Sequence, residues 1–202
     1  KKQFGGKLKA FVSGGGALDK EIGEFLNSVG LPTLQGYGLT ETSPVVSCNP
    51  IHKIKVETVG PPFRGNQVKI ANDGEILVKG ENVMLGYWNK KKETDEVIID
   101  GWLHTGDIGE IDPEDGYLKI TDRKKDIIVS AGGDNISPAK IENMITNEPE
   151  IDQCMVYGDK KNYLVALIVP SKDFLEEKEK IYNVIEKINK KLTLLEKIKR
   201  IQ

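Results

Sequence analysis

The sequence is poor in the residues that mark disulfide-rich and membrane-spanning proteins. It has only two cysteines in 202 residues, Cys48 and Cys154. A disulfide framework needs a denser set, so we expect reduced thiols. No apolar run reaches the roughly 18 residues that a transmembrane helix needs. Histidine is also scarce, and His104 has no partner pattern for catalysis, so a structural role is expected for it. These shortages favour a cytoplasmic protein.

The chain also lacks an excess of charge of either sign. It carries 29 Lys and Arg against 31 Asp and Glu, which gives a net charge of -2. A general nucleic-acid binder needs a basic surplus to neutralise phosphates, so no nucleic-acid partner is expected. Charged residues make up 30% of the chain, which is typical of a well-solvated surface. The composition leaves the oligomeric state open.

The first region, residues 1–57, has the pattern of a strand–helix–strand unit. Residues 8–13 form a short apolar run that ends in three glycines, which predicts a buried strand and a loop. Residues 17–29 repeat apolar side chains at spacings of three and four, which predicts one helical face, and Gly30 suits the C-terminal cap. A strand-like segment follows at residues 33–35, so we expect a parallel sheet. The apolar face is formed by Leu18, Ile22, Phe25, Leu26 and Val29.

The second region, residues 58–122, changes to short alternating strands. Residues 67–70 and 75–79 alternate around an Asn-Asp-Gly turn, which is a hairpin signature. Residues 108–111 and 117–120 repeat the pattern around an Asp-Gly turn. We therefore expect a small antiparallel, β-barrel-like subdomain.

The third region, residues 123–202, predicts a small α+β domain. Residues 127–129 form a strand, and Ser137 and Pro138 suit the N-cap and first position of a helix. Residues 154–157 and 163–169 have the pattern of paired strands. The helix that follows Ser137 is expected to bury Ile141, Met144 and Ile145.

The last part of the chain favours a long amphipathic helix. Apolar residues recur at helical spacing from Ile181 to Ile198, and the opposite face is rich in Lys and Glu. Lys197, Lys199 and Arg200 are then surface residues of this helix. The predicted fold class is α/β, with α+β character overall, in three parts that span residues 1–57, 58–122 and 123–202.

Two glycine-containing clusters in the first region suit nucleotide chemistry. Glycines such as Gly14, Gly15 and Gly16 let the backbone approach a ligand closely, although a plain flexible turn is the alternative. In the cluster Gly36-Tyr37-Gly38-Leu39-Thr40-Glu41, the Tyr ring is able to lie against a base. The Thr hydroxyl suits a phosphate, and the Glu carboxylate suits Mg²⁺. A turn followed by a capping Thr-Glu pair is the other reading of this cluster.

Two further clusters lie near the end of the second region. Residues Thr105–Asp107 follow one apolar strand and precede another, so we expect a loop there. In such a loop, the Asp107 carboxylate is able to accept from both ribose hydroxyls, as acids do in other nucleotide sites. An Asp that bonds its own turn is the alternative. The run from Asp122 to Asp126 has the character of a solvated loop, in which the guanidinium of Arg123 is able to clamp nucleotide oxygens.

Taken in this order, the clusters resemble the adenylate-forming superfamily of acyl-CoA synthetases, luciferases and adenylation domains. The resemblance runs from Ser13 to about Val169 and includes residues 74–80, 84–88 and 126–142. Residues 135–138 and 159–164 are similar to the long-chain fatty acid–CoA ligases in particular. The resemblance implies the substrates ATP, fatty acid and CoA, with AMP as a product and Mg²⁺ as the metal.

The resemblance also implies roles for individual residues. Gly14, Gly15 and Gly16 would line the acyl and adenine pocket, with Gly36 and Gly38 flanking the adenine-stacking Tyr37. Thr40 and Glu41 would be catalytic, the first on the α-phosphate and the second as the Mg²⁺ ligand. Asp107 would bind the ribose with help from Arg123. Lys125 matches the hinge about which a C-terminal domain turns, and Gly132 and Gly133 would border the CoA channel.

Two parts of the family's machinery are missing from the sequence. No Ser/Thr/Gly-rich phosphate loop ends in Lys, and no Lys has the family's Pro/Thr-Lys-Gly/Leu-Lys context near the end. The chain is therefore expected to be an internal or C-terminal fragment of a ligase and to be inactive alone. Any peripheral membrane contact is expected to come from parts of the ligase outside this sequence.

Three alternatives stay open at this point. Within the superfamily, a medium-chain or aryl-CoA ligase or a carrier-protein adenylating enzyme would share these clusters. Outside it, a truncated protein could serve as a binding module without catalysis. The acyl chain length is beyond the reach of this sequence, since most walls of a fatty-acid tunnel would lie upstream.

Overall fold

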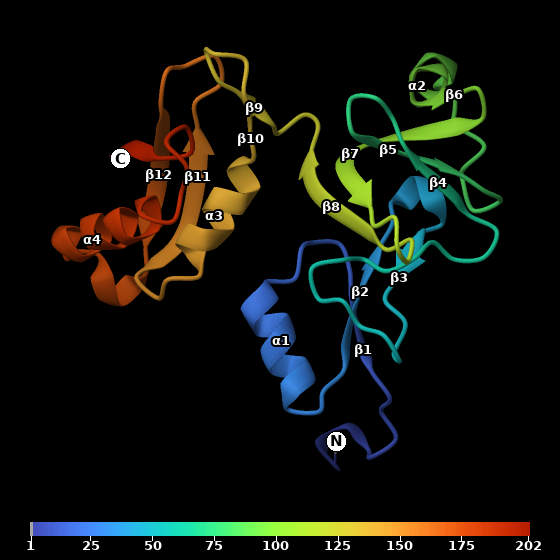
Figure 1. Cartoon of the computed structure of the whole chain (residues 1–202), viewed down its shortest axis with the longest axis horizontal. Helices are drawn as coiled ribbons and strands as arrows, with labels where there is room; N and C mark the ends of the chain where they lie inside the picture. Colours follow the sequence, from blue (N-terminus) through green and yellow to red (C-terminus); the bar gives the residue numbers. More distant parts are fainter. Residues whose placement is uncertain (1) are drawn as a thin grey trace. The chain divides into compact units, whose positions relative to one another are not determined.

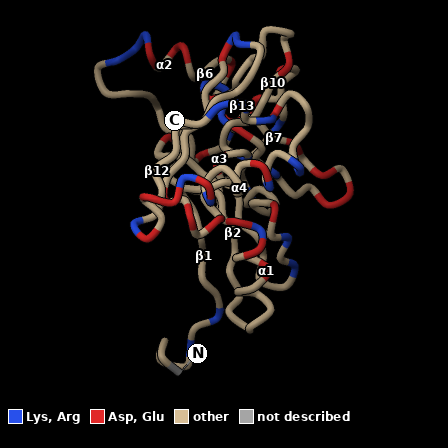
Figure 2. Tube along the Cα trace, turned by 90° about the vertical axis from the view of Figure 1, so that its left-hand side faces the viewer, with Lys and Arg blue, Asp and Glu red and all other residues tan. Residues whose placement is uncertain are grey.

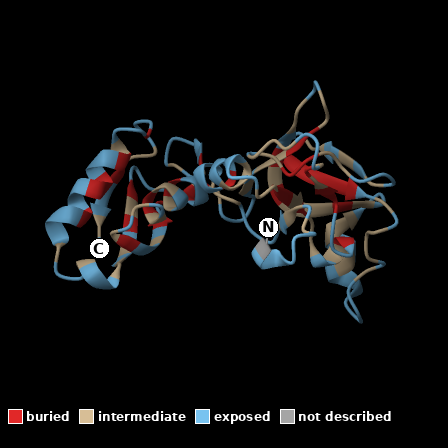
Figure 3. Cartoon of the chain, turned by 90° about the horizontal axis from the view of Figure 1, so that it is seen from below, coloured by how far each residue is buried: buried red, intermediate tan, exposed pale blue. Residues whose placement is uncertain are grey.

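The computed structural model describes residues 2–202 in two compact units that meet between Thr121 and Asp122. Each unit has its own cluster of buried residues (Figure 3). Segments of both charges are spread along the trace (Figure 2). None of the helices in the described part of the chain is long and apolar enough to cross a membrane. The three-part division at residues 57 and 122 stays a prediction.

The first unit opens with the predicted strand–helix–strand arrangement (Figure 1). β1 pairs parallel with β2, with Phe11 opposite Thr33, and β3 pairs antiparallel with β2. This confirms the parallel βαβ unit. A 3₁₀ helix, η1 (Lys2–Phe4), precedes it. The elements are β1 (Phe11–Ser13), α1 (Lys20–Ser28), β2 (Thr33–Tyr37) and β3 (Ser47–Cys48).

Helix α1 begins three residues later than predicted, at Lys20, and ends one residue before the predicted end. The Asp19 side chain accepts from Ile22 N at 3.0 Å, and Gly30 follows the helix at φ +74°, a backbone region that glycine favours. The buried residue of α1 is Gly23, against which Val56 packs closely. Much of the predicted apolar face is exposed, because α1 rests on the unit through this small residue. The exposed members are Ile22, Phe25 and Val29.

The second sheet of this unit contains the predicted hairpin. β4 and β5 pair antiparallel, with Ile70 opposite Ile76, and Gly74 occupies the turn at φ +86°. The sheet order is β4-β5-β7-β6, and β8 pairs with β7. The predicted strands at 108–111 and 117–120 lie largely within β7 and β8. The elements are β4 (Gln67–Ile70), β5 (Glu75–Lys79), α2 (Lys91–Val97), β6 (Ile98–Ile99), β7 (Trp102–Ile111) and β8 (Leu118–Arg123).

One hydrophobic cluster joins the two sheets of the first unit. Tyr37 of β2 belongs to the same cluster as Ile76 and Val78 of β5 and Leu118 of β8. Backbone bonds add to this link, since Val59 N donates to Leu118 O at 2.8 Å. The end of β2 is therefore held against the sheet that carries Asp107.

The second unit is a small α+β structure around its own core. β11 and β12 pair antiparallel, which confirms the predicted strand pair, and β9 and β10 form a short hairpin. Ser137 caps α3 by accepting from Lys140 N at 3.2 Å, also as predicted. Ile141 and Ile145 are fully buried, and Met144 packs against them partly buried. The elements are β9 (Ile128–Val129), β10 (Asn135–Ile136), α3 (Pro138–Thr146), β11 (Ile151–Tyr157), β12 (Leu164–Pro170), η3 (Lys172–Phe174), α4 (Lys178–Asn189) and β13 (Ile198–Ile201).

The prediction of one helix from Ile181 to Ile198 is wrong. Helix α4 ends at Asn189, and Ile198 begins β13, which pairs parallel with β12. The Asn189 amide closes the intervening loop, because its Oδ1 accepts from Ile198 N at 2.8 Å and its Nδ2 donates to Ile198 O at 2.9 Å. Lys199 and Arg200 are therefore exposed residues of a strand and not of a helix.

We expect Asn189→Ala to lower the free energy of unfolding of the second unit by about 1–3 kcal/mol, because two backbone groups of Ile198 lose their partner. Urea denaturation of the chain, followed by circular dichroism, measures this change. The matched control is Asn183→Ala, since Asn183 is an exposed residue of the same helix. Equal urea midpoints for the two variants would contradict the role of Asn189.

Candidate functional site

The first candidate pair comes from two strands of the first unit. Tyr37 ends β2, and its hydroxyl donates to Asp107 Oδ2 at 2.7 Å, a bond between residues 70 positions apart. Both side chains are buried, at 7% and 5% exposure. A hydrogen bond offsets much of the cost of burying a carboxylate. The structure thus brings together the two residues that the sequence suggested for adenine and ribose.

Asp107 lies in a bulge of β7, whereas the sequence predicted a loop between two strands. Glu75 pairs with Ile108 and Leu77 pairs with His104, so Ile76 alone stands opposite the three residues Thr105–Asp107. A bulge bends a strand and re-aims its side chains. Gly106 takes φ +73°, which a side chain there would strain. The prediction missed the bulge because its bonds come from β5, which lies about 30 residues earlier.

Thr40 and Glu41 begin a short 3₁₀ helix, η2 (Thr40–Thr42), directly after β2. The turn is built by the fully buried Thr42, whose Oγ1 accepts from Leu39 N at 2.9 Å and donates to Leu39 O at 3.0 Å. Thr40 itself is exposed, so its side chain is accessible to a ligand. Sequence reasoning missed Thr42, although a Thr-x-Thr-Ser-Pro run is a signal for such a turn.

Glu41 is held by a residue that sequence reasoning did not single out. Tyr87 Oη donates to Glu41 Oε1 at 2.8 Å, and Met84 N donates to Glu41 O at 2.8 Å. The hydrogen bond to Glu41, together with burial, raises the pKa of Tyr87. Residues 84–88 thus pack beside the Thr40–Glu41 turn, and this segment holds Glu41 in place.

The glycines of the first unit fall into two groups. Gly14 lies next to Gly36, because a Cβ on Gly14 would be 3.6 Å from Gly36 O, and Gly15 and Gly16 continue as an exposed turn. Gly38 is different, since a Cβ there would clash with the backbone of Pro44. Local packing is therefore sufficient to explain Gly38, and ligand access is the open reading for the other four.

Arg123 and Lys125 lie where the second unit begins. Arg123 O accepts from Asp126 N at 2.9 Å and from Ile127 N at 3.1 Å, which closes a turn around Lys125. Both side chains are exposed. A short turn between two compact units is a suitable place for a hinge, because a few backbone dihedrals there reorient a whole unit.

Gly132 and Gly133 form the tip of the β9–β10 hairpin. Ser130 closes it, since its Oγ accepts from Gly132 N at 3.2 Å and from Asp134 N at 3.1 Å. Gly133 takes φ +90°. The hairpin is tied to a neighbouring loop, where Ala131 N donates to Lys161 O at 3.1 Å. Two exposed glycines on a fixed tip leave the backbone open to a close ligand.

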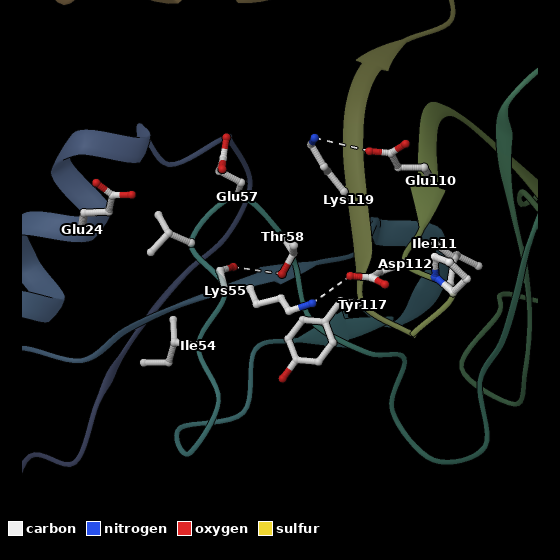
Figure 4. A pocket seen from close by; sticks show the side chains of 12 residues that line it. Glu24, Ile54, Lys55, Glu57, Thr58, Glu110, Ile111, Asp112, Tyr117 and Lys119 are labelled. Carbon is white, nitrogen blue, oxygen red and sulfur yellow. Dashed lines mark hydrogen bonds and ion pairs between the residues drawn. The ribbon is translucent and has the colours of Figure 1, made fainter. Parts of the chain in front are cut away.

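A cavity of the first unit lies elsewhere. It has a volume of about 640 Å³, and none of the sequence-predicted site residues lines it (Figure 4). Lys55, which lines the cavity, pairs with two carboxylates, since its Nζ is 2.8 Å from Asp112 Oδ2 and 2.7 Å from Asp115 Oδ2. Hydrogen bonds from Lys53 and Lys55 lower the pKa of Asp115 to about 2. These ion pairs hold the loop before Thr58 against the Asp112–Tyr117 turn.

The described residues suit a magnesium ion only if a bound nucleotide supplies part of its ligands. Within residues 2–202, no group of three or more His, Cys, Asp or Glu could hold a metal by itself. Mg²⁺ is commonly bound by one or two carboxylates together with substrate phosphates and water. The single carboxylate of Glu41, fixed by Tyr87, suits that arrangement.

These features define a candidate nucleotide-binding α/β protein. They are the parallel βαβ unit, the hydrogen bond from the Tyr37 hydroxyl to the buried Asp107 carboxylate, and the Thr40–Glu41 pair that follows β2. Two family models match the chain: the AMP-binding enzyme model over residues 1–88 and the AMP-binding enzyme C-terminal domain model over residues 125–201. The chain belongs to the AMP-binding enzyme family.

The chain resembles CoA ligases of two substrate types. It is 47% identical to the long-chain-fatty-acid–CoA ligase FadD15 of Mycobacterium bovis, over 82% of this chain and 27% of that protein. It is 38% identical to the 2-succinylbenzoate–CoA ligase of Bacillus cereus, over 96% of this chain and 44% of that protein. The chain thus spans between about a quarter and a half of the length of these relatives.

A solved structure has the same fold. The o-succinylbenzoate CoA synthetase of Bacillus subtilis, in complex with its acyl-adenylate intermediate, has a TM-score of 0.84 and 28% identity. The match covers 96% of this chain and 42% of that chain. This likeness confirms the predicted fold class, an α/β and α+β arrangement of the adenylate-forming type.

Proposed function

We propose that this chain is part of a long-chain fatty acid–CoA ligase. In the first step, a carboxylate oxygen of the fatty acid attacks the α-phosphorus of ATP, and the bond from that phosphorus to pyrophosphate breaks. In the second step, the CoA sulfur, after losing its proton, attacks the acyl carbonyl carbon, and AMP leaves. The 47% identity to FadD15 supports the long-chain branch. A cytoplasmic location is part of this proposal.

The observation that carries the proposal is the bond between Tyr37 and Asp107. The Tyr37 hydroxyl fixes one carboxylate oxygen, so the carboxyl group needs little reorganisation to accept from ribose hydroxyls. A carboxylate that is already held in its binding orientation binds a hydroxyl group more strongly than a mobile carboxylate does, because less conformational entropy is lost on binding. Arg123 is proposed to add a second contact to the nucleotide.

The phosphates are proposed to meet the turn that follows β2. The exposed Thr40 hydroxyl would donate to the α-phosphate. The backbone of Gly14, Gly15 and Gly16 would line the adenine and acyl side, and Tyr37, flanked by Gly36 and Gly38, would contact the adenine. Glu41, oriented by Tyr87, would hold the Mg²⁺ ion. When bound, the ion would neutralise charge that develops on the phosphate oxygens.

The second unit is proposed to serve the second half-reaction. Lys125 would be the hinge, which is supported by the C-terminal family model starting at residue 125. Gly132 and Gly133 would lie along the CoA channel, where their lack of Cβ leaves room for a narrow pantetheine arm. The predicted boundaries at residues 57 and 122 belong to this proposal as well.

A second candidate is a ligase for an aromatic acid. The relative that acts on 2-succinylbenzoate matches a larger share of this chain, 96% against 82%, at the lower identity of 38%. Comparing palmitate with 2-succinylbenzoate as substrates of a full-length protein that carries this sequence would separate the two. Faster turnover of palmitate is expected.

We expect Asp107→Ala, in a full-length protein that carries this sequence, to raise the KM for ATP by roughly 10- to 150-fold. The reason is the loss of one charge-assisted hydrogen bond, worth about 1.5–3 kcal/mol. Steady-state kinetics with varied ATP measures it, and Asp107→Asn should lose less because its amide oxygen still accepts from Tyr37. The control is Asp95→Ala, an exposed residue of α2. An unchanged KM in a folded Asp107→Ala protein would argue against the ribose role.

A further inference from the structure

Glu75 is a buried carboxylate that none of the proposed steps uses. It is the first residue of β5 and has 4% exposure. Burying a charged carboxylate is costly unless its oxygens receive hydrogen bonds. Both of its carboxylate oxygens have partners in β7, around the bulge that carries Asp107: Oε1 accepts from Gly106 N, and Oε2 lies within hydrogen-bond distance of His104 Nδ1.

The first bond replaces one that the bulge removes. Where Thr105–Asp107 stand opposite Ile76 alone, the regular ladder cannot pair every backbone group. Glu75 Oε1 accepts from Gly106 N at 2.9 Å, so a side chain takes the place of the missing backbone acceptor. An N–H group left without any partner there would cost a substantial part of the stability of this conformation.

The second contact of Glu75 is with His104, the residue directly before the bulge. Glu75 Oε2 lies 3.1 Å from His104 Nδ1, which donates when that nitrogen carries its proton. His104 is also the last residue of β7 in regular register before the bulge, opposite Leu77. One carboxylate therefore holds the strand before the bulge and the glycine at its centre.

Two further bonds of the bulge come from Thr105. Its Oγ1 donates to Ile76 O at 2.8 Å and accepts from Asp107 N at 3.1 Å. With the bond from Tyr37 to Asp107 Oδ2, every residue from His104 to Asp107 is thus held by β2 or β5, or by a neighbour in the bulge. The orientation of the Asp107 carboxylate depends on this set of contacts.

We propose that Glu75 is the positioning residue of the ribose-binding Asp107. It acts through Gly106 and His104 and has no contact with the nucleotide itself. The proposal rests on the ribose role given to Asp107 above. It also gives His104 a function beyond the structural role predicted from the sequence, since its ring is the second contact between Glu75 and β7.

A test must separate positioning from a general contribution to folding. ATP and 2′,3′-dideoxy-ATP differ in the ribose hydroxyls that Asp107 is proposed to bind. A residue that acts through Asp107 affects only the first nucleotide, whereas a loosened fold affects both. The variants are Glu75→Ala, Glu75→Gln and, as a matched control, Glu110→Ala, because Glu110 is an exposed residue of the same strand as Asp107.

In a full-length protein that carries this sequence, Glu75→Ala is expected to raise the KM for ATP about 10-fold with a smaller effect on kcat. The KM for 2′,3′-dideoxy-ATP should stay within about twofold of the unsubstituted protein. Glu75→Gln should restore most of the ATP affinity, because its amide oxygen still accepts from Gly106 N. Combined with Asp107→Ala, the Glu75→Ala change should add nothing further.

Two results would overturn the positioning role while leaving the proposed function intact. One is an equal rise in KM for both nucleotides with Glu75→Ala, and the other is no rise for either in a protein whose urea midpoint is unchanged. A different result would overturn the proposed function itself: the unsubstituted protein would not distinguish ATP from 2′,3′-dideoxy-ATP, and Asp107→Ala would change neither KM.

Discussion

Incubated with ATP, Mg²⁺, CoA and a labelled long-chain fatty acid, the 202-residue chain alone is expected to form no measurable acyl-CoA. The transition state of adenylation spreads negative charge over phosphate oxygens, which need donors on several sides. In the proposed site, Thr40, Glu41 and Arg123 supply one side. The sequence has neither the phosphate loop of the family nor its Lys-bearing segment. Because removing even one such donor costs about 10²–10³ in rate, a chain without both is expected to have little activity.

Chromatography of the labelled thioester measures this outcome. The share of the relatives that the chain spans, 27% for FadD15, is consistent with an incomplete site. A full-length protein that carries the same sequence is the positive control. Turnover by the chain alone at a rate near that control would contradict the account, because residues described here as structural would then supply the phosphate contacts.

Lys125→Pro is expected to separate the two half-reactions in a full-length protein. Proline fixes φ and restricts the residue before it, so a turn that must change its dihedrals is held near one conformation. The half-reaction that needs the other orientation should slow by about 10²-fold, which is the typical effect of a misplaced catalytic group. The ATP–pyrophosphate exchange rate reports the first half-reaction, and thioester formation from a supplied acyl-AMP reports the second.

The control for the hinge is Lys125→Ala, which removes the same exposed side chain and leaves the backbone mobile. It should change both half-reactions by less than about threefold, since a single exposed charge contributes little. The hinge assignment would be wrong if the proline variant slowed both half-reactions to the same extent in a folded protein. It would also be wrong if neither rate changed.

The parts of the fold that depend on neighbouring residues could be predicted from the sequence. The β4–β5 hairpin follows from alternation around Gly74, and the start of α3 follows from the Ser137–Pro138 pair. The end of helix α1 follows in the same way from Gly30. In each of these cases, the deciding residues lie only a few positions apart.

The errors arise where a distant partner overrides the local pattern. Residues 190–201 keep a helical spacing of apolar side chains, yet Ile198 gains more as a strand beside β12, with Asn189 closing the loop. The predicted loop at Thr105–Asp107 is a bulge because Glu75 and Ile76 supply its partners. The spacing of apolar residues along the sequence does not reveal these distant partners.

The candidate site shows the same division. Their chemistry and the family resemblance single out Tyr37 and Asp107, and the 70-residue separation between them gives no reason to expect a direct bond. Tyr87 and Glu75 lie in segments that carry the resemblance, but their contacts with Glu41 and Gly106 form only in the folded chain. Spacing thus indicates candidate groups, and packing decides which of them act on one another.

The central claim is that the Tyr37–Asp107 site belongs to an enzyme that joins a fatty acid to AMP. Its most direct test is ATP–pyrophosphate exchange by a full-length protein that carries this sequence, measured with and without palmitate and with and without Mg²⁺. The account predicts exchange that requires both palmitate and the metal and that falls sharply in Asp107→Ala. Exchange that is absent with palmitate, or that is unchanged in Asp107→Ala, would contradict it.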